Sequence, residues 1–184
     1  MPWPLIIGGA VVLILIIWFV AAYNGLTRLQ VSAEEGFSTM DVYLKKRYDL
    51  IPNLVETVKG YAKHEAETLE KVIQARNMAT SAQTIDEKIA ADNQLTGTLK
   101  TLFAVAEAYP ELKANTNFLD LQNQLKSVEQ DIANSRKYYN GTVARYNTKC
   151  RVIPSNIVAG VGGFKQMKLY EADAESRENV KVQF

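Results

Sequence analysis

The segment Asp41–Glu65, which reads DVYLKKRYDLIPNLVETVKGYAKHE, decides the fold of this 184-residue chain. Its apolar residues recur at helical spacing, which predicts a helix with one buried face. Pro52 removes a backbone donor within this pattern. Because Ile51 is a poor N-cap, we expect the helix to continue through the proline instead of restarting there. Gly60 favours a left-handed helix end, so we expect the chain to reverse direction near it.

The residues before this segment predict a membrane anchor. Met1–Thr27 carries no charged side chain, and about 20 apolar residues are enough to span the core of a bilayer. Trp18 and Tyr23 occur where interfacial aromatic residues are expected. A cleaved signal peptide is the rival interpretation, but no Lys or Arg precedes the apolar run. The sequence therefore predicts a retained single-pass anchor over residues 1–23.

Two further features of the anchor bear on its surroundings. Arg28 is the first charged residue after the span, and the positive-inside rule then favours a cytoplasmic C-terminal domain. Ala21 and Gly25 form a pair of small residues four apart, which allows transmembrane helices to approach closely. Simple packing against lipid is equally consistent with this pair.

Three more helical patterns follow the opening helix. The first covers residues 65–79. The second begins at a capping box, with Thr84 as N-cap and Glu87 three residues later, and ends before Pro110. The third runs for about 35 residues, from caps near Asn115 toward Ile153. Its apolar alternation contains one stutter, as in a coiled coil that unwinds locally.

Short connections between these helices favour antiparallel neighbours. The sequence therefore predicts an all-α fold: a single N-terminal transmembrane helix that continues into an antiparallel (up-and-down) four-helix bundle over residues 24–153. Residues 154–184 are expected to form a non-helical, apolar and Gly-rich C-terminal tail that ends in a strand-like pattern at 180–184. If the opening helix instead continued to Ala79, the number of helices would change by one and the tail would end at the distal tip.

Composition gives little support to catalysis or nucleic-acid binding. The chain has 21 Lys and Arg against 20 Asp and Glu, so its net charge provides no general attraction to nucleic acid. Cys150 and His64 are the only cysteine and histidine, which excludes an internal disulfide and any site built from two imidazoles of this chain. No phosphate loop or nucleophile elbow occurs. We expect no catalytic residue, metal site or cofactor.

Several long motifs resemble the LemA family of bacterial membrane proteins. They are YNGL (23–26), the segment 41–65 quoted above, TLEKVIQAR (68–76), AYPELKANTNFLDLQNQL (108–125), YYNGTVARYN (138–147) and PSNIVAGVGGF (154–164). The resemblance implies a LemA-like helical bundle on a single-pass anchor in the bacterial inner (plasma) membrane. It implies no established reaction. Family members have been connected with magnetosome formation and with cell-surface signalling, and these associations differ among members.

Four charged residues of the opening segment form the first candidate interaction site: Lys45, Lys46, Arg47 and Asp49. Their spacing allows pairing along one helix face. Arg47 falls on the apolar stripe, so it must find a partner or extend its head group outward. The candidate partners on other helices are Glu107, Glu129 and Asp131. The alternative use of Arg47 is a charged contact between subunits.

The second candidate interaction site is the uncharged tail, through Ile157, Val158, Val161 and Phe164. An exposed apolar run is a liability, so we expect this segment to pack on the membrane surface, on a neighbouring subunit or on the bundle.

The function that these features favour is a non-enzymatic scaffold that self-associates into a homo-oligomer and organises or shapes the membrane. Membrane lipid and further copies of the chain are the expected partners, and nucleic acid is not. The alternative is an adaptor that recruits or regulates another membrane protein, such as a protease or a signalling protein. An enzyme is the third hypothesis, and it requires convergent ionisable groups that the sequence does not display.

Overall fold

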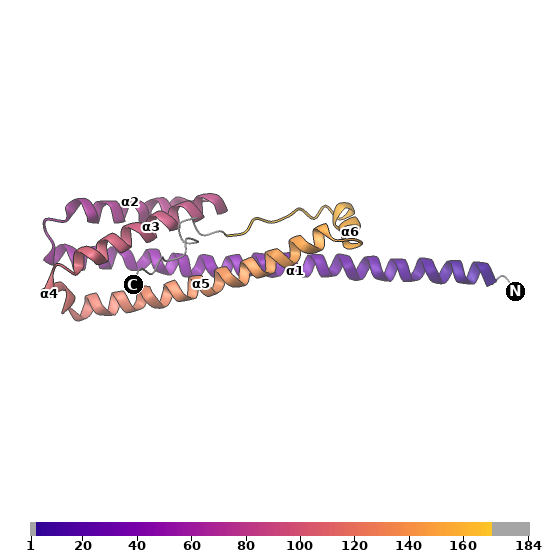
Figure 1. Cartoon of the computed structure of the whole chain (residues 1–184), viewed down its shortest axis with the longest axis horizontal. Helices are drawn as coiled ribbons and strands as arrows, with labels where there is room; N and C mark the ends of the chain where they lie inside the picture. The colour runs from indigo at the N-terminus through magenta and orange to yellow at the C-terminus, as the bar shows by residue number, and fades with distance from the viewer. Residues whose placement is uncertain (1–2, 171–184) are drawn as a thin grey trace, which may run out of the picture. The chain divides into compact units, whose positions relative to one another are not determined.

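The computed structural model describes residues 3–170 as helices, turns and connecting segments (Figure 1). Within that range the secondary structure is all-α, as predicted, and contains no strand. The chain divides into two compact units. Among the described residues, unit 1 comprises residues 3–38 and Ser135–Leu169, and unit 2 comprises Thr39–Asn134 and Tyr170. The strand-like pattern predicted for 180–184 lies outside the described residues.

Helix α1 (Trp3–Tyr61) is one uninterrupted helix of 59 residues. It begins with the predicted apolar span, which is long and apolar enough to cross a membrane and has no buried residue in its most apolar stretch. This span suggests a membrane anchor. The helix continues through Pro52, as predicted.

The predicted left-handed helix end at Gly60 is wrong, because Gly60 lies inside α1 and does not have a positive φ. The helix ends at Tyr61, and a turn over residues 62–65 separates it from α2 (Ala66–Ser81). Backbone bonds hold this turn: the amide of Ala62 donates to the Val58 carbonyl and that of Glu65 to the Ala62 carbonyl. The turn therefore forms without a glycine in the left-handed conformation. The alternative in which α1 continues to Ala79 is also excluded.

Unit 2 contains the end of α1, then α2, α3 (Ile85–Ala106), α4 (Pro110–Lys113) and the start of α5 (Thr116–Arg151). Helices α2 and α3 pack against each other. Its core consists of buried aliphatic side chains from α1, α2, α3 and α5, among them Leu44, Ile51, Leu54, Val72, Leu95, Leu102, Leu125 and Val128. These positions follow the apolar stripes of the sequence, so burial of those stripes accounts for the helices.

The helix ends of unit 2 follow the local signals in the sequence. The capping box at the start of α3 is confirmed: the amide of Glu87 donates to Thr84 Oγ1, and the Glu87 carboxylate accepts from the Thr84 amide. Helix α3 ends at Ala106, and Pro110 then begins the short α4 at its first turn, where proline is tolerated. The side chain of Asn115 caps α5 by accepting from the Phe118 amide. Helix α5 has 36 residues, close to the predicted length.

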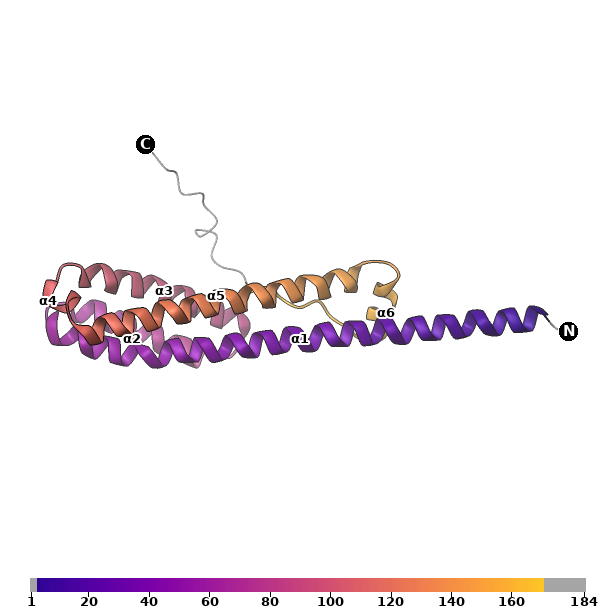
Figure 2. The same cartoon turned by 90° about the horizontal axis from the view of Figure 1, so that it is seen from below.

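Unit 1 contains the start of α1, the end of α5 and a short helix, α6 (Ser155–Val161), which lies beside α1 in Figure 2. The prediction of a wholly non-helical tail is therefore wrong. Helix α6 forms because Val158 and Ala159 are buried in a cluster with Leu26 of α1 and Tyr146 of α5. This packing outweighs the low helix propensity of a Gly-rich sequence, since tertiary burial supplies most helical stability in proteins.

Candidate functional site

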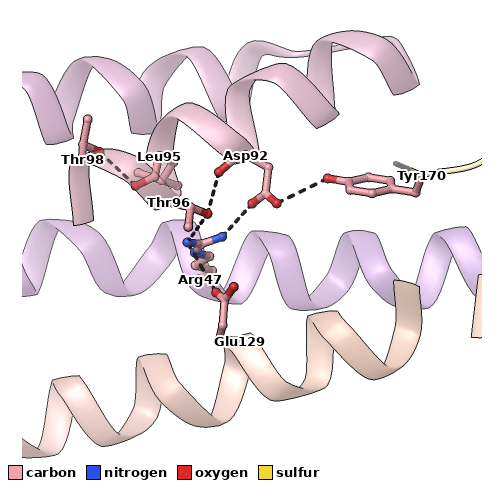
Figure 3. A network of polar contacts seen from close by, with 7 residues as sticks. All are labelled: Arg47, Asp92, Leu95, Thr96, Thr98, Glu129 and Tyr170. Carbon is pink, nitrogen blue, oxygen red and sulfur yellow. Dashed lines mark hydrogen bonds and ion pairs between the residues drawn. The ribbon is translucent and has the colours of Figure 1, made fainter. Parts of the chain in front are cut away.

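A buried arginine forms the polar centre of unit 2 (Figure 3). Arg47 of α1 is 3% exposed, and its Nη1 donates to Asp92 Oδ1 of α3 at 2.7 Å. Its Nη2 donates to Thr96 Oγ1 at 2.9 Å and lies 3.4 Å from Glu129 Oε2 of α5. The hydroxyl of Tyr170 donates to the second Asp92 oxygen at 3.5 Å. One guanidinium thus joins α1, α3 and α5.

The sequence places these groups through simple helical spacing. Arg47 lies on the buried stripe of α1 between Leu44 and Ile51, so its head group must satisfy its charge inside the unit. Asp92 and Thr96 are four residues apart on α3 and therefore share the face that meets it. The network is what a buried charge requires, since an unpaired guanidinium in this position would be strongly destabilising.

The predicted partners of Arg47 were found only in part. Glu129 is brought to Arg47, whereas Glu107 pairs with Lys113. Asp92 was missed, although it stands on the apolar stripe of α3 between Ile89 and Leu95. A charged residue on the apolar stripe of another helix was therefore the signal that could have identified Asp92 as the partner of Arg47.

The three consecutive basic residues Lys45, Lys46 and Arg47 do not share one environment. Arg47 points into unit 2, while Lys45 and Lys46 are exposed. Lys45 pairs with Asp49 one turn later at 2.6 Å, and both side chains are largely exposed. Such a pair contributes little to stability because water and salt screen it. Lys45, Lys46 and Asp49 are therefore available at the surface, and Arg47 has an internal role.

Burial changes the chemistry of the tyrosine next to Arg47. Tyr48 is buried, and its hydroxyl has no hydrogen-bond partner among the described residues. Burial is the main cause that raises the pKa of Tyr48, and the negative charge of Asp92 raises it further. The phenol therefore stays protonated at physiological pH.

An open cavity of about 470 Å³ adjoins the arginine network. Its walls carry Lys100 and Lys126 in addition to Arg47, together with Phe103 and Glu129. The charge of Arg47 at this cavity is already balanced by Asp92 and Glu129. In the part of the chain that the structure describes, no three His, Cys, Asp or Glu side chains are grouped so as to hold a metal ion.

The predicted tail residues separate into two sets. Val158 is buried against Leu26, and the Phe164 ring packs edge-on to Tyr23 at a centroid distance of 5.1 Å. Ile157 and Val161 are exposed on the other side of α6. The tail therefore packs on its own chain through one side and leaves a second apolar side uncovered.

The small residues of the anchor also differ from each other. Ala21 is exposed. A Cβ on Gly25 would lie 3.2 Å from Nζ of Lys149, so the close neighbour of this glycine is a side chain of α5 within unit 1. A role of this pair in contacts between transmembrane helices stays a prediction.

Three side chains of α5 hold the segment after α6. Tyr139 donates to the Lys168 carbonyl at 2.8 Å and Tyr146 to the Lys165 carbonyl at 2.9 Å. Asn147 forms a two-way bridge with the backbone of Met167, donating at 2.8 Å and accepting at 2.9 Å. These bonds satisfy the backbone of an extended segment that has no strand partner among the described residues, and they were not predicted from the sequence.

The described residues form an all-helical protein with a candidate membrane anchor. Its features are a long helix with an apolar first part, a helical unit with a buried arginine, and a C-terminal segment that is hydrogen-bonded to α5. The sequence model of the LemA family matches residues 36–184, and the chain belongs to the LemA family. This confirms the resemblance seen in the sequence motifs.

Individual relatives agree with this assignment. The chain is 25% identical to protein LemA of Metamycoplasma hominis, over 88% of this chain and 74% of the relative. It is 21% identical to magnetosome protein MamQ of Magnetospirillum gryphiswaldense, over 80% of this chain and 64% of the relative. Magnetosome protein MamQ 2 of Paramagnetospirillum magneticum is 29% identical over 45% of this chain and 30% of the relative. The chain thus spans less than two thirds of either magnetosome protein.

Proposed function

We propose that this protein is a non-enzymatic scaffold, anchored in the bacterial inner membrane by α1, that self-associates into a homo-oligomer and organises or shapes the membrane. The observation that carries the proposal is the continuity of α1, which bears both the apolar span and Arg47. One helix thus connects the apolar span directly to the segment that carries the buried arginine. The names of the LemA and MamQ relatives state no reaction, which agrees with a structural role.

The domain that this scaffold presents is an antiparallel, up-and-down four-helix bundle. Short connections at residues 62–65 and 82–84 support antiparallel neighbours, as does the connection through α4. The placement of the bundle on the cytoplasmic side rests on the positive-inside rule, since Arg28 closely follows the span.

The surface that we assign to self-association lies on α1 and consists of Val42, Lys45, Lys46 and Asp49. Val42 lies three and four residues before Lys45 and Lys46, and Asp49 lies four and three residues after them, so the four side chains share one broad helix face. Val42 is an exposed apolar side chain within this charged surface. The combination suits a contact in which a small apolar centre is surrounded by ion pairs that set the register between copies.

The test is the mass of the full-length protein extracted in a mild detergent, measured by native mass spectrometry. A discrete oligomer is expected. Reversing both charges in Lys45→Glu/Lys46→Glu should shift the population toward monomer, whereas the matched control Lys71→Glu, on the exposed face of α2, should not. A monodisperse monomer of the unaltered protein would contradict the proposal.

An adaptor is the second candidate, and an apolar groove of about 490 Å³ favours it. The floor of this groove is formed by Val55, Ala62, Leu69 and Ile73, and charged residues of α1 and α2 surround it. An amphipathic helix of another membrane protein, such as a protease or a signalling protein, fits a groove of this kind.

Co-purification at fixed stoichiometry distinguishes the two candidates. An adaptor should lose its partner on Ile73→Asp and keep it on Lys45→Glu/Lys46→Glu. A partner that is retained equally by both variants would exclude the groove as its binding site.

A further inference from the structure

One side of the α6 region is an uncovered apolar ridge. Ile157 and Val161, four residues apart on α6, are 59% and 74% exposed, and Ile153, in the turn between α5 and α6, is 82% exposed. Val158 and Ala159, on the other side of α6, are buried in unit 1. We call the three exposed residues the α6 ridge. Packing inside the unit explains the buried side of α6 and leaves the ridge unexplained.

The ridge stands at the end of the predicted membrane span. The α6 cluster packs on Phe19, Ala22 and Leu26 of α1, and the Phe164 ring meets the Tyr23 ring. A helix that starts at Trp3 and rises 1.5 Å per residue covers the roughly 30 Å of a bilayer core by about Ala22. Helix α6 therefore lies level with the boundary between the lipid tails and the headgroups.

Unit 1 also has a large positive net charge, although the net charge of the whole chain is close to zero. It holds eight Lys and Arg against two Glu, a net charge of +6, although the net charge of the chain is +1. From Ile132 to Tyr170 there is no acidic residue. Lys149 and Arg151 precede the ridge, Lys165 follows it, and all three are exposed.

We propose that unit 1 makes a second contact with the bilayer beside α1. The α6 ridge inserts into the interfacial region, roughly 5–10 Å deep, as the apolar face of an interfacial helix does. Lys149, Arg151 and Lys165 then bind anionic lipid headgroups, which attract basic residues near a membrane surface. This contact requires no self-association and therefore goes beyond the scaffold function.

Lipid is favoured over a second protein copy for two reasons. Helix α6 packs beside the end of the candidate membrane span, whose most apolar stretch has no buried residue, so insertion of the ridge would extend the apolar surface that the span offers to lipid. The concentration of like charge around the ridge opposes the approach of an identical basic unit and favours an anionic surface. Two points of attachment would also fix the rotation of α1 about its own axis.

The test uses the full-length protein, one copy per nanodisc, with a polarity-sensitive fluorophore at position 157 in the background Cys150→Ser, Ile157→Cys. In discs that contain phosphatidylglycerol, the emission should shift to the blue and quenching by aqueous iodide should fall several-fold. The matched control is the same label at another exposed apolar site, through Met78→Cys on α2. That label should remain accessible to iodide.

Two variants separate the parts of the proposal. Ile153→Asp/Val161→Asp should abolish protection of the label, and both sites are exposed, so the fold of the unit should survive. Lys149→Glu/Arg151→Glu should abolish the difference between phosphatidylglycerol discs and pure phosphatidylcholine discs. Equal iodide access at positions 157 and 78 in both lipids would overturn the proposal. Protection that appears only with two copies per disc would also overturn it, because the ridge would then be a contact between copies.

Discussion

Arg47 and Asp92 form an ion pair at 2.7 Å in which both side chains are buried, 45 residues apart in the chain. Removing two charges from water is unfavourable, and their attraction offsets this only when the remaining donors and acceptors are satisfied. Thr96, Glu129 and Tyr170 supply those bonds. The pair therefore defines how α1, α3 and α5 meet more than it adds to net stability.

Asp92→Ala should destabilise the protein by about 3–5 kcal/mol, because it leaves a buried guanidinium with only the half-exposed Glu129 as a charged partner. Thermal and urea unfolding of the detergent-solubilised protein, followed by circular dichroism, measure this effect. The control Asp49→Ala removes an exposed pair and should change stability by less than about 1 kcal/mol.

The double variant Arg47→Met/Asp92→Leu tests the same idea from the opposite direction. It removes both charges and retains apolar volume, so its stability should return close to that of the unaltered protein or exceed it. A double variant as unstable as Asp92→Ala would mean that the pair contributes more through packing than through charge.

Prediction from the sequence succeeded where one local signal decided the outcome. The capping box at Thr84 fixed the start of α3, and the poor N-cap at Ile51 predicted that α1 passes through Pro52. Arg47 was recognised as a buried charge because it breaks an apolar stripe. Its partner Asp92 was missed, because helical spacing defines the faces of each helix and does not define which faces meet.

The tail shows the opposite limit. Local propensity predicted a non-helical segment, and α6 formed because Leu26 and Tyr146 offered an apolar surface far away in the sequence. The hydrogen bonds from the Tyr139 and Asn147 side chains to backbone carbonyls could likewise not be predicted from the spacing of apolar residues. Contacts of this kind depend on tertiary placement, which no local pattern specifies.

Glu87 should make stability depend on pH. Hydrogen bonds from the backbone amides of Thr84 and Gln83 hold the pKa of Glu87 below its ordinary value of 4.5 in the folded state. The unfolded chain then takes up the proton first as the pH falls. The stabilisation is therefore fully present above about pH 4.5 and is lost as the pH decreases through the lower folded pKa.

The measurement is the difference in unfolding free energy between the unaltered protein and Glu87→Gln, from neutral pH to the acid range. The difference should shrink below about pH 4.5. Because hydrogen bonds cause the pKa shift, high salt should leave most of the effect in place, whereas a long-range charge effect would be screened. A difference that stays constant with pH would contradict the capping role of the carboxylate.

Asn147→Ala should release the segment that follows α6. The substitution removes both bonds to Met167 and leaves a backbone amide and a carbonyl without their partner, at a cost of about 1–3 kcal/mol. Hydrogen exchange at the Met167 amide should become faster. The control Asn134→Ala lies on the exposed surface of α5 and should leave that exchange rate unchanged.

Two glycines near α6 should respond oppositely to the same substitution. A Cβ on Gly162 would lie 2.6 Å from Cε2 of Phe164 and 3.0 Å from Cε2 of Tyr23, so Gly162→Ala must displace the Phe164 ring, at a cost of about 1–3 kcal/mol. Gly160 lies within α6, and a Cβ there would meet no atom within 4 Å. Gly160→Ala should therefore be neutral or stabilising by up to about 1 kcal/mol. Thermal unfolding of both variants measures the contrast.

In a Phe164→Ala background the effect of Gly162→Ala should shrink, because the ring that the new methyl group contacts is absent. An unchanged effect there would show that a contact other than the Phe164 ring, such as the Tyr23 ring, excludes the side chain.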